Sequence, residues 1–499
     1  MSKIRRQSII SSAVVYTGFA FGLLNTYLFA REGGFTKEQY GLTGVFIAVS
    51  NIFFSLSQFG MTAYIYKFYP YYNDNLPKKK NDMLSIALIV SLIGYCLVII
   101  AGFLLKDLVI RKFGTNSPEL ITYYKWIFPF GLGLTLFSIL EAYAWQLREA
   151  VFTNFLREIL FRLLTTVLII LTLTSFIPDF DLFIKLYSLT YLVIAFVLIF
   201  YLIKKSEFNL SSSFSIVSKK FFKKILRLCS FVYGGALLFT ISSVFDTLVI
   251  ASVIGIEMAA VYTLAQNMAS LVQAPQRGVI SSSLASLSQA WKDKNMGLID
   301  KIYHRSSINQ LIFATAMFSL VYLNFIDAVY TLHLNKVYLD AINVFLFIGL
   351  TKIVDMGTGV SGQIIGTSTK WRFDFLTGIL LLLITLPLNY ILTKKIGVTG
   401  PAIANLISFS VYNAIRYWFL AKKFNLQPFN SKSLLTLLLA AVTFTITYLL
   451  FNGKIGFEWL FIRSIVFLAI FISGSIALKL SPDILPVLQS IKKKLGLSK

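Results

Sequence analysis

The sequence KKKNDMLSIALIVSLIGYCLVIIAGFLL, residues 78–105, decides the fold class of this chain. Its first three residues are lysines, and the run from residue 83 to residue 105 contains no charged side chain. An α-helix needs about 20 consecutive apolar residues to cross the hydrocarbon core of a bilayer. The stretch therefore predicts a transmembrane helix with a basic loop at one end.

Similar apolar runs recur along nearly the whole chain and predict about fourteen spans. They cover residues 8–30, 41–66, 83–105, 122–145, 155–177, 182–203, 230–253, 258–283, 307–330, 341–366, 373–393, 398–421, 433–451 and 459–478. Hydrophobic residues make up 57% of the 499, or about 284, and fourteen spans of roughly 20 residues need about 280. Because no apolar surplus remains for a soluble core, the sequence predicts an all-α polytopic membrane protein.

The lysines and arginines of the loops alternate between a rich and a poor side. About 31 of the 46 lie on the side that holds both termini, and about 12 lie on the opposite side. By the positive-inside rule the rich side is cytoplasmic, which predicts that both termini are in the cytosol. The net charge of +24 is then mainly an orientation signal. Nucleic acid is not expected as a partner, whereas the basic clusters are suited to membrane lipids with anionic headgroups.

Few residues have the spacing of a catalytic or metal site. The two cysteines, Cys96 and Cys229, lie in or near apolar runs without CxxC spacing, and the two histidines lie in different loops. No GxxxxGK[ST] phosphate-binding loop occurs. The DxD-like string from Asp179 to Asp181 lies in a short outer loop. We expect no cofactor, no metal ion and no enzymatic activity.

The longest cytoplasmic connection, residues 204–229, separates six predicted spans from eight. We expect an N-terminal six-helix bundle at 1–203, a cytoplasmic linker at 204–229, a C-terminal six-helix bundle at 230–421, and two further helices with a basic tail at 422–499. Six plus six spans suggest an internal repeat. Tyr40 and Tyr262, 222 positions apart, occupy equivalent places in the first loop of each half. Because each half has an even number of spans, the symmetry axis is expected along the membrane normal.

Three segments resemble bacterial polysaccharide flippases. Residues 29–41, FAREGGFTKEQYG, are similar to the first-loop signature of that family, in which an acidic residue, a tyrosine and a glycine open the second span. Residues 245–255, FDTLVIASVIG, with Tyr262 and Pro275, resemble the seventh and eighth spans. Thr247 departs from the pattern, because the family often has a basic residue there. Residues 396–405, IGVTGPAIAN, resemble a loop near the family's C-terminal end.

The resemblance covers spans one to twelve in order. It implies the fold of the multidrug, oligosaccharidyl-lipid and polysaccharide exporter superfamily, MATE-like, with two six-helix bundles around a central cleft. It also implies a bacterial cell (inner) membrane protein that acts on a lipid-linked oligosaccharide. Polysaccharide polymerase and glycosyltransferases are expected partners of such a protein.

Ionisable residues inside spans are costly and are therefore candidates for function. Lys352 and Asp355 lie near a predicted midplane, and their i,i+3 spacing places both on one helix face. They either neutralise each other while helices pack, or Lys352 meets a substrate phosphate. Arg277 follows Pro275, which can open the helix, and it either faces an anion or reaches the cytoplasmic surface. Arg416 is near a span end, which favours reaching the surface over binding substrate.

Three acidic residues are candidates for coupling transport to a proton or sodium ion. Asp246 lies in the outer part of the seventh span without a charged neighbour in sequence, and packing against hydroxyls is its alternative explanation. Glu141, near the cytoplasmic end of the fourth span, is expected either to couple an ion or to pair with a nearby arginine. Asp355 is the third candidate.

The function expected from these features is the translocation of undecaprenyl-pyrophosphate-linked oligosaccharide, an O-antigen, capsule or exopolysaccharide repeat unit, from the cytoplasmic to the outer leaflet by alternating access. A multidrug or cation antiporter of the same fold and a peptidoglycan-precursor flippase stay open as alternatives. A membrane glycosyltransferase or polymerase is less well supported, because no loop is long enough for a soluble catalytic domain.

Overall fold

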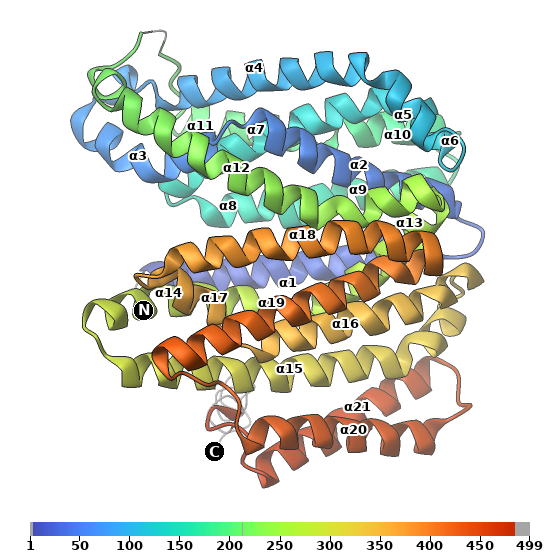
Figure 1. Cartoon of the computed structure of the whole chain (residues 1–499). Helices are drawn as coiled ribbons and strands as arrows, with labels where there is room; N and C mark the ends of the chain where they lie inside the picture. Colours follow the sequence, from blue (N-terminus) through green and yellow to red (C-terminus); the bar gives the residue numbers. More distant parts are fainter. Residues whose placement is uncertain (1–2, 212, 485–499) are drawn as a thin grey trace. The chain divides into compact units, whose positions relative to one another are not determined.

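The structure, a computed structural model, describes residues 3–211 and 213–484. No β-strand occurs in this described part, and its regular elements are helices, as the sequence predicts. The helices form two compact units, Met1–Ala260 and Val261–Lys499 (Figure 1). The prediction of an all-α polytopic protein is confirmed.

The first unit contains twelve whole helices labelled α and the start of a thirteenth. They are α1 (Lys3–Ala30), α2 (Lys37–Ser57), α3 (Met61–Asn75), α4 (Met83–Leu104), α5 (Lys106–Phe113), α6 (Pro118–Thr122), α7 (Ile127–Gln146), α8 (Ala150–Asn154), α9 (Phe161–Leu173), α10 (Phe180–Ser188), α11 (Thr190–Lys204) and α12 (Ile216–Val253). Short turns of 3-10 helix lie at Lys78–Lys80 and Tyr124–Trp126, and a π-helix, Phe155–Leu160, joins α8 to α9. The helix α13 (Ile256–Gln273) begins in this unit and ends in the second.

The second unit continues with eight further helices labelled α. They are α14 (Gln276–Lys292), α15 (Met296–Thr331), α16 (Ala341–Gly357), α17 (Ser361–Thr367), α18 (Trp371–Ile396), α19 (Gly400–Phe424), α20 (Ser431–Phe451) and α21 (Phe457–Ala477). Two 3-10 turns lie at Lys336–Asp340 and Gly397–Thr399.

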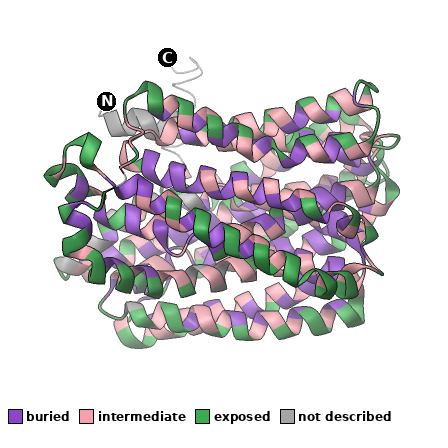
Figure 2. Ribbon diagram, turned by 90° about the horizontal axis from the view of Figure 1, so that it is seen from above, coloured by how far each residue is buried: buried purple, intermediate pink, exposed green. Residues whose placement is uncertain are grey.

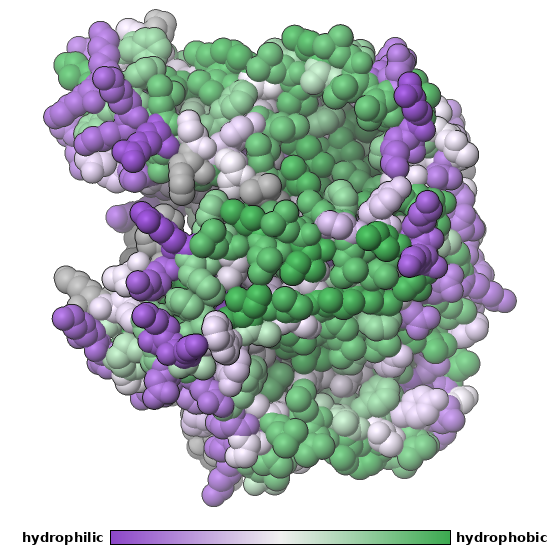
Figure 3. All heavy atoms as spheres, in the orientation of Figure 1, coloured by the Kyte–Doolittle hydropathy of each residue, from purple (hydrophilic) through white to green (hydrophobic). Residues whose placement is uncertain are grey.

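Ten helical stretches among the described residues are long and apolar enough to cross a membrane. Each of the fourteen predicted spans falls on one helix or on consecutive helical elements, but the number of crossings stays a prediction. Helix α4 shows the expected lipid-facing character, because Ile89, Ile93, Leu97 and Ile100 are all exposed along one side. Hydrophobic side chains cover the middle of the helices and hydrophilic ones gather at their ends (Figure 3). Buried residues lie on the faces that helices turn toward their neighbours (Figure 2).

Several predicted spans are interrupted. The second breaks between α2 and α3, where Phe59 and Gly60 have φ angles of 43° and 77°. The tenth breaks between α16 and α17 at Gly359, with φ of 61°, and the eighth breaks just before Pro275. Non-helical backbone within a membrane is tolerated where it is buried in protein or lines a cavity. The breaks therefore mark places where backbone groups become available to side chains or ligands.

The predicted domain boundaries stay predictions. Helix α12 begins at Ile216, inside the predicted linker 204–229, and runs without interruption to Val253. In the second unit α20 and α21 pack against α15. Arg463 of α21 is buried there and pairs with Asp327 of α15, which fixes the last two helices to the unit.

Candidate functional site

A cluster of four charged side chains lies between helices of the first unit. Glu141 of α7 is only 5% exposed, and its Oε2 lies 2.6 Å from Nη2 of Arg157 in the π-helix. One residue further on, Glu158 pairs with Arg162 of α9 at 3.0 Å. Two arginines and two glutamates make the cluster neutral. Pairing is what permits charges to stay in a protein interior, since an isolated buried charge is very costly.

The helix geometry at this point directs the two arginines to different neighbours. The π-helix inserts a wider turn into the stretch 150–173, and such turns are frequent at functional sites. Arg157 contacts α7, where it pairs with Glu141 and lies over the ring of Phe137. Arg162 contacts α1, where it donates to the carbonyl oxygen of Gly18.

Glycine on α1 makes room for Arg162. A Cβ atom on Gly22 would lie 2.8 Å from Nη1 of Arg162, which is too close for a real contact. Asn25, one turn further along α1, donates to the carbonyl oxygen of Arg162 at 2.9 Å. The side chain of Thr166 in turn donates to Asn25. The glycines of α1 thus let the side chain of Arg162 approach the backbone of this helix closely.

Two polar atoms of this cluster have no hydrogen-bond partner among the described residues. They are Oε1 of Glu141 and Nε of Arg157, both buried. Burying such atoms unsatisfied costs about 1–3 kcal/mol each. The cluster therefore retains one acceptor and one donor that a proton, an ion or a ligand group can satisfy.

A second polar cluster lies in the second unit, beside the broken eighth and tenth spans. Asp355, near the end of α16, accepts hydrogen bonds from the amides of Gln276 at 2.8 Å and Asn413 at 3.4 Å. Thr358, at the break, donates to Oδ1 of Asn413 at 3.0 Å. Three helices, α14, α16 and α19, thus contribute to the surroundings of one carboxylate.

This cluster reaches a cavity. Thr358 and Asn413 line a space of about 610 Å³ between α15, α16, α19 and α20, whose other walls are mostly apolar. Lys352 lies one turn before Asp355 on α16 and is half-buried. The carboxylate of Asp355 is thus engaged by the neutral amides of Gln276 and Asn413.

Arg416 does not reach the surface as its position near a span end suggests. Its side chain is 11% exposed and pairs with Asp374 of α18. The guanidinium also lies over the ring of Tyr412, 3.9 Å from the centroid. Gly362 of α17 makes room for it, because a Cβ atom there would lie 2.9 Å from Nη1. Arg416 and Arg162 are thus held in the same manner, each between a carboxylate and a glycine.

Asp246 and Arg277 are the two remaining residues that the sequence predicts for the site. Asp246 is buried in α12, at 5% exposure. Arg277 lies in the first turn of α14, and its side chain lies outside the described residues. Asp179 and Asp181, the DxD-like pair, have structural partners: Asp179 caps α10 by accepting from the amide of Leu182 at 2.8 Å, and Asp181 pairs with Lys185.

Sequence reasoning missed part of these clusters. The basic residues that it selected as candidates inside spans were Arg277, Lys352 and Arg416, and it did not select two others that the helices enclose. Arg162 lies near the middle of the helical stretch 150–173, and Arg463 is buried in α21. The available signal was the i,i+4 spacing of Glu158 and Arg162 inside a predicted span.

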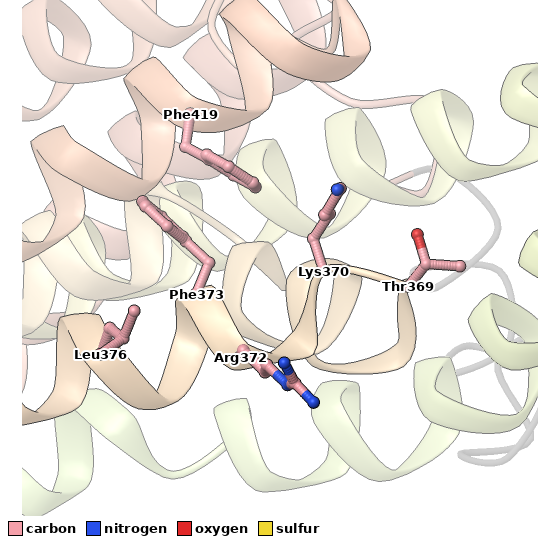
Figure 4. A pocket seen from close by; sticks show the side chains of 6 residues that line it. All are labelled: Thr369, Lys370, Arg372, Phe373, Leu376 and Phe419. Carbon is pink, nitrogen blue, oxygen red and sulfur yellow. The ribbon is translucent and has the colours of Figure 1, made fainter.

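A further cavity of about 430 Å³ opens beside the start of α18 (Figure 4). Its lining includes Lys370 and Arg372, together with the stacked rings of Phe373 and Phe419. Figure 4 shows the side chains of Lys370 and Arg372 pointing in opposite directions. They do not converge on one point, so this cavity is not a clamp for a single anion.

The fold is that of a class of membrane transporters. A solved structure of the lipid II flippase MurJ, in an inward closed conformation, matches with a TM-score of 0.73 at 18% identity over 94% of this chain and 98% of that chain. An inward-facing multidrug resistance MATE family transporter of the MOP superfamily matches with a TM-score of 0.65 at 16% identity, over 84% and 98%. Identities this low show likeness of fold alone. The chain is a multi-pass membrane protein with the MurJ and MATE transporter fold.

The family is shown by sequence. The model of the family described as "Polysaccharide biosynthesis protein" matches residues 4–287, more than half of the chain, and this protein belongs to that family. No curated protein matches the sequence. The resemblance to polysaccharide flippases and the MATE-like fold that it implied are confirmed. The cluster of the first unit lies within the matched residues, whereas Lys352, Asp355 and Arg416 lie beyond them.

Proposed function

We propose that this chain is a flippase that moves an undecaprenyl-pyrophosphate-linked oligosaccharide from the cytoplasmic to the outer leaflet. The observation that carries the proposal is the membership of the polysaccharide biosynthesis family, combined with a transporter fold. A transporter of this kind needs no catalytic group, because no bond in the cargo is made or broken.

The paired arginines support an anionic cargo. A pyrophosphate carries acceptor oxygens that match the fork of a guanidinium. A carboxylate pairs with each of three arginines, Arg157, Arg162 and Arg416. A phosphate can replace that carboxylate, and the guanidinium then still has an anionic partner. Such an exchange of partners releases a glutamate or aspartate to take up a proton or sodium ion. Lys352 and Arg277 stay candidates for the same role.

The proposed mechanism is alternating access, in which the substrate site opens first inward and then outward. An ion gradient drives such a cycle only if the ion binds the two states with different affinity. Glu141, with one unsatisfied buried oxygen, and Asp355, which accepts from two neutral amides, are the carboxylates best placed to sense an ion. Asp246 is a third.

A peptidoglycan-precursor flippase is the second candidate. The match to the lipid II flippase covers 94% of this chain, whereas the match to the multidrug transporter covers 84%, or about 419 of 499 residues. A fold likeness that covers the larger share of the chain favours a lipid-linked cargo over a small drug or cation. The partner bonds of Asp179 and Asp181 weigh against a glycosyltransferase that uses them to hold a metal.

The charge distribution of the loops supports a position in the bacterial inner membrane with both termini in the cytosol. The partners proposed there are the glycosyltransferases that build the repeat unit and the polymerase that joins it.

Deletion of the gene tests the proposal. Finished lipid-linked repeat units should accumulate on the cytoplasmic face, detected by their inaccessibility to an impermeant sugar-oxidising reagent in intact spheroplasts. Loss of the repeat unit itself would point to an enzyme. Normal repeat units with missing cell-wall precursor outside would point to the peptidoglycan alternative. Normal amounts of both glycans outside would reject flipping altogether.

A further inference from the structure

The first turns of α12 carry five exposed cations. They are Lys219, Lys220, Lys223, Lys224 and Arg227. Successive residues of a helix are about 100° apart, so the five lie within a sector of roughly 140°. None of the ion pairs in the described part of the chain includes any of them.

The spacing of these five cations lowers the stability of the helix. Lys219 and Lys223, Lys220 and Lys224, and Lys223 and Arg227 are like-charged i,i+4 pairs, which destabilise a helix. Orientation by the positive-inside rule needs basic residues in this loop, but it does not need them on one side of one helix. The arrangement indicates that an anionic surface neutralises this side.

An exposed apolar stripe borders the basic sector. Phe222 is 55% exposed and Leu226 is 51% exposed, one turn apart. On the helical projection they lie together, roughly 20–60° beyond the edge of the basic sector. A stripe of large apolar side chains beside a sector of lysines is the pattern of a helix that lies in the membrane interface.

The opposite side of the helix is fixed to the protein. Ser215 caps α12 by accepting from the amide of Ser218 at 3.1 Å. Asp82, buried at the start of α4, accepts from the amide of Ser215 at 2.9 Å and from the hydroxyl of Ser218 at 2.6 Å. Val217 and Ile225 are buried in the same hydrophobic core as Phe68 of α3. Because these contacts fix the rotation of the helix, they also fix where the basic sector and apolar stripe face.

The length of α12 places this region at the membrane boundary. Its 38 residues extend for about 57 Å, whereas the hydrocarbon core is about 30 Å thick. The apolar part from about Ser230 to Val253 is sufficient to span that core. The turns before it therefore lie at the headgroup level on the side that the loop charges identify as cytoplasmic.

We propose that the exposed side of α12 between residues 216 and 227 is a docking surface for anionic phospholipid of the cytoplasmic leaflet. The lysines and Arg227 contact phosphate headgroups, and Phe222 and Leu226 insert at the boundary with the acyl chains. Each cation near an anionic membrane surface contributes about a fivefold factor in affinity. The proposal goes beyond the proposed function, because it holds whatever cargo the protein carries.

A fluorescence experiment tests it on the full chain. Cys96 is replaced by serine, the buried Cys229 stays, and Phe222→Cys is labelled with an environment-sensitive fluorophore. The protein is reconstituted in vesicles of phosphatidylcholine alone or with phosphatidylglycerol, with brominated acyl chains as quenchers. We expect stronger quenching in the vesicles with phosphatidylglycerol, reduced to the phosphatidylcholine level by the triple change of Lys219, Lys220 and Lys223 to Gln. The matched triple change of Lys78, Lys79 and Lys80 to Gln should leave the quenching as it was.

Each of the following outcomes overturns the proposal. Equal quenching in both kinds of vesicle shows that anionic lipid does not hold the helix. Binding of soluble polyglutamate without bromine quenching shows that an acidic soluble partner occupies this side instead. If the triple variant does not fold, a salt titration of the labelled parent protein decides: the extra quenching must fall as salt screens the charges. Extra quenching that salt does not change rejects the headgroup contact.

Discussion

Lys37, in the first turn of α2, forms an ion pair with Glu257, in the first turn of α13, 220 residues further along the chain. The two residues belong to the loops that the sequence matches to each other as the first loop of each half, near Tyr40 and Tyr262. Beside the pair, Gly41 of α2 lies against the carbonyl oxygen of Ile256. The glycine of the first-loop signature is therefore explained by the close approach of a second loop.

Gly41→Ala should destabilise the protein. Its Cβ would overlap with the backbone of Ile256, and overpacking in a well-packed interior costs about 1–3 kcal/mol. We expect a lower melting temperature of the purified protein in detergent and less protein in the membrane. Gly34→Ala in the same loop is the control, since its Cβ would meet its neighbours at an ordinary 3.4 Å. Equal melting temperatures of the two variants would show that the helices do not approach so closely at Gly41.

Exchanging the charges of Lys37 and Glu257 should be better tolerated than reversing either one. Both side chains are about a third exposed, so the pair contributes only about 0–1 kcal/mol. Lys37→Glu alone places two acidic groups together, and adding Glu257→Lys restores the attraction. Surface glycan of the complemented deletion strain measures the effect. A double variant no better than the single one contradicts the pairing.

Arg157→Ala should be strongly destabilising, by about 3 kcal/mol, because it leaves Glu141 buried without its partner. Adding Glu141→Gln removes the uncompensated charge and should recover most of the loss. Thermal unfolding of the single and double variants gives the coupling between the two residues. Losses that simply add would mean that the pair does not interact.

Asp355→Asn and Lys352→Ala should impair transport with the protein still present in the membrane. The Asp355→Asn change keeps the size of the side chain but removes the negative charge that the amides of Gln276 and Asn413 stabilise. If Asp355 senses the coupling ion, transport into vesicles should lose its dependence on the ion gradient. Asp374→Asn is a comparison carboxylate, paired with Arg416 instead. Full transport by Asp355→Asn with an unchanged gradient dependence removes it from the coupling step.

The segment that follows the last helix, α21, should respond to pH. The hydrogen bond from Arg305, with a second from Asn309 at 2.7 Å, holds the pKa of Asp483 below its usual range. A carboxyl group with a lowered pKa stabilises the folded state above its unfolded pKa, and that contribution is lost as the pH falls through the folded value. Asp483→Asn should therefore be less stable than the parent protein at pH 7, with the difference closing below about pH 4. Melting curves over this range measure it. A difference that persists in acid argues against the contact with Arg305.

The candidate site was only partly predictable. Asp355 and Glu141 stand out in the sequence because charged residues interrupt apolar runs. Arg162 does not stand out, because it follows Arg148 closely enough in sequence to be taken for part of a basic span margin. In the structure the residues from Ala150 to Leu173 form a single helical stretch, and Arg162 lies near its middle. The partners of Arg416 were not predictable from the sequence, since only packing brings Asp374, Tyr412 and Gly362 around its guanidinium.

Sequence by itself determined that the chain crosses a membrane many times, which loops are basic, and which family it belongs to. These properties follow from local composition and from short motifs, because a bilayer imposes the same length and polarity on each span. Only the tertiary structure decided which charges meet. Glu141 and Arg157 lie on different helices, and so do Asp355 and Asn413, and nothing in local periodicity fixes the rotation and depth at which two helices pack. That rotation turned the exposed cations of α12 outward and fixed the contact between Lys37 and Glu257.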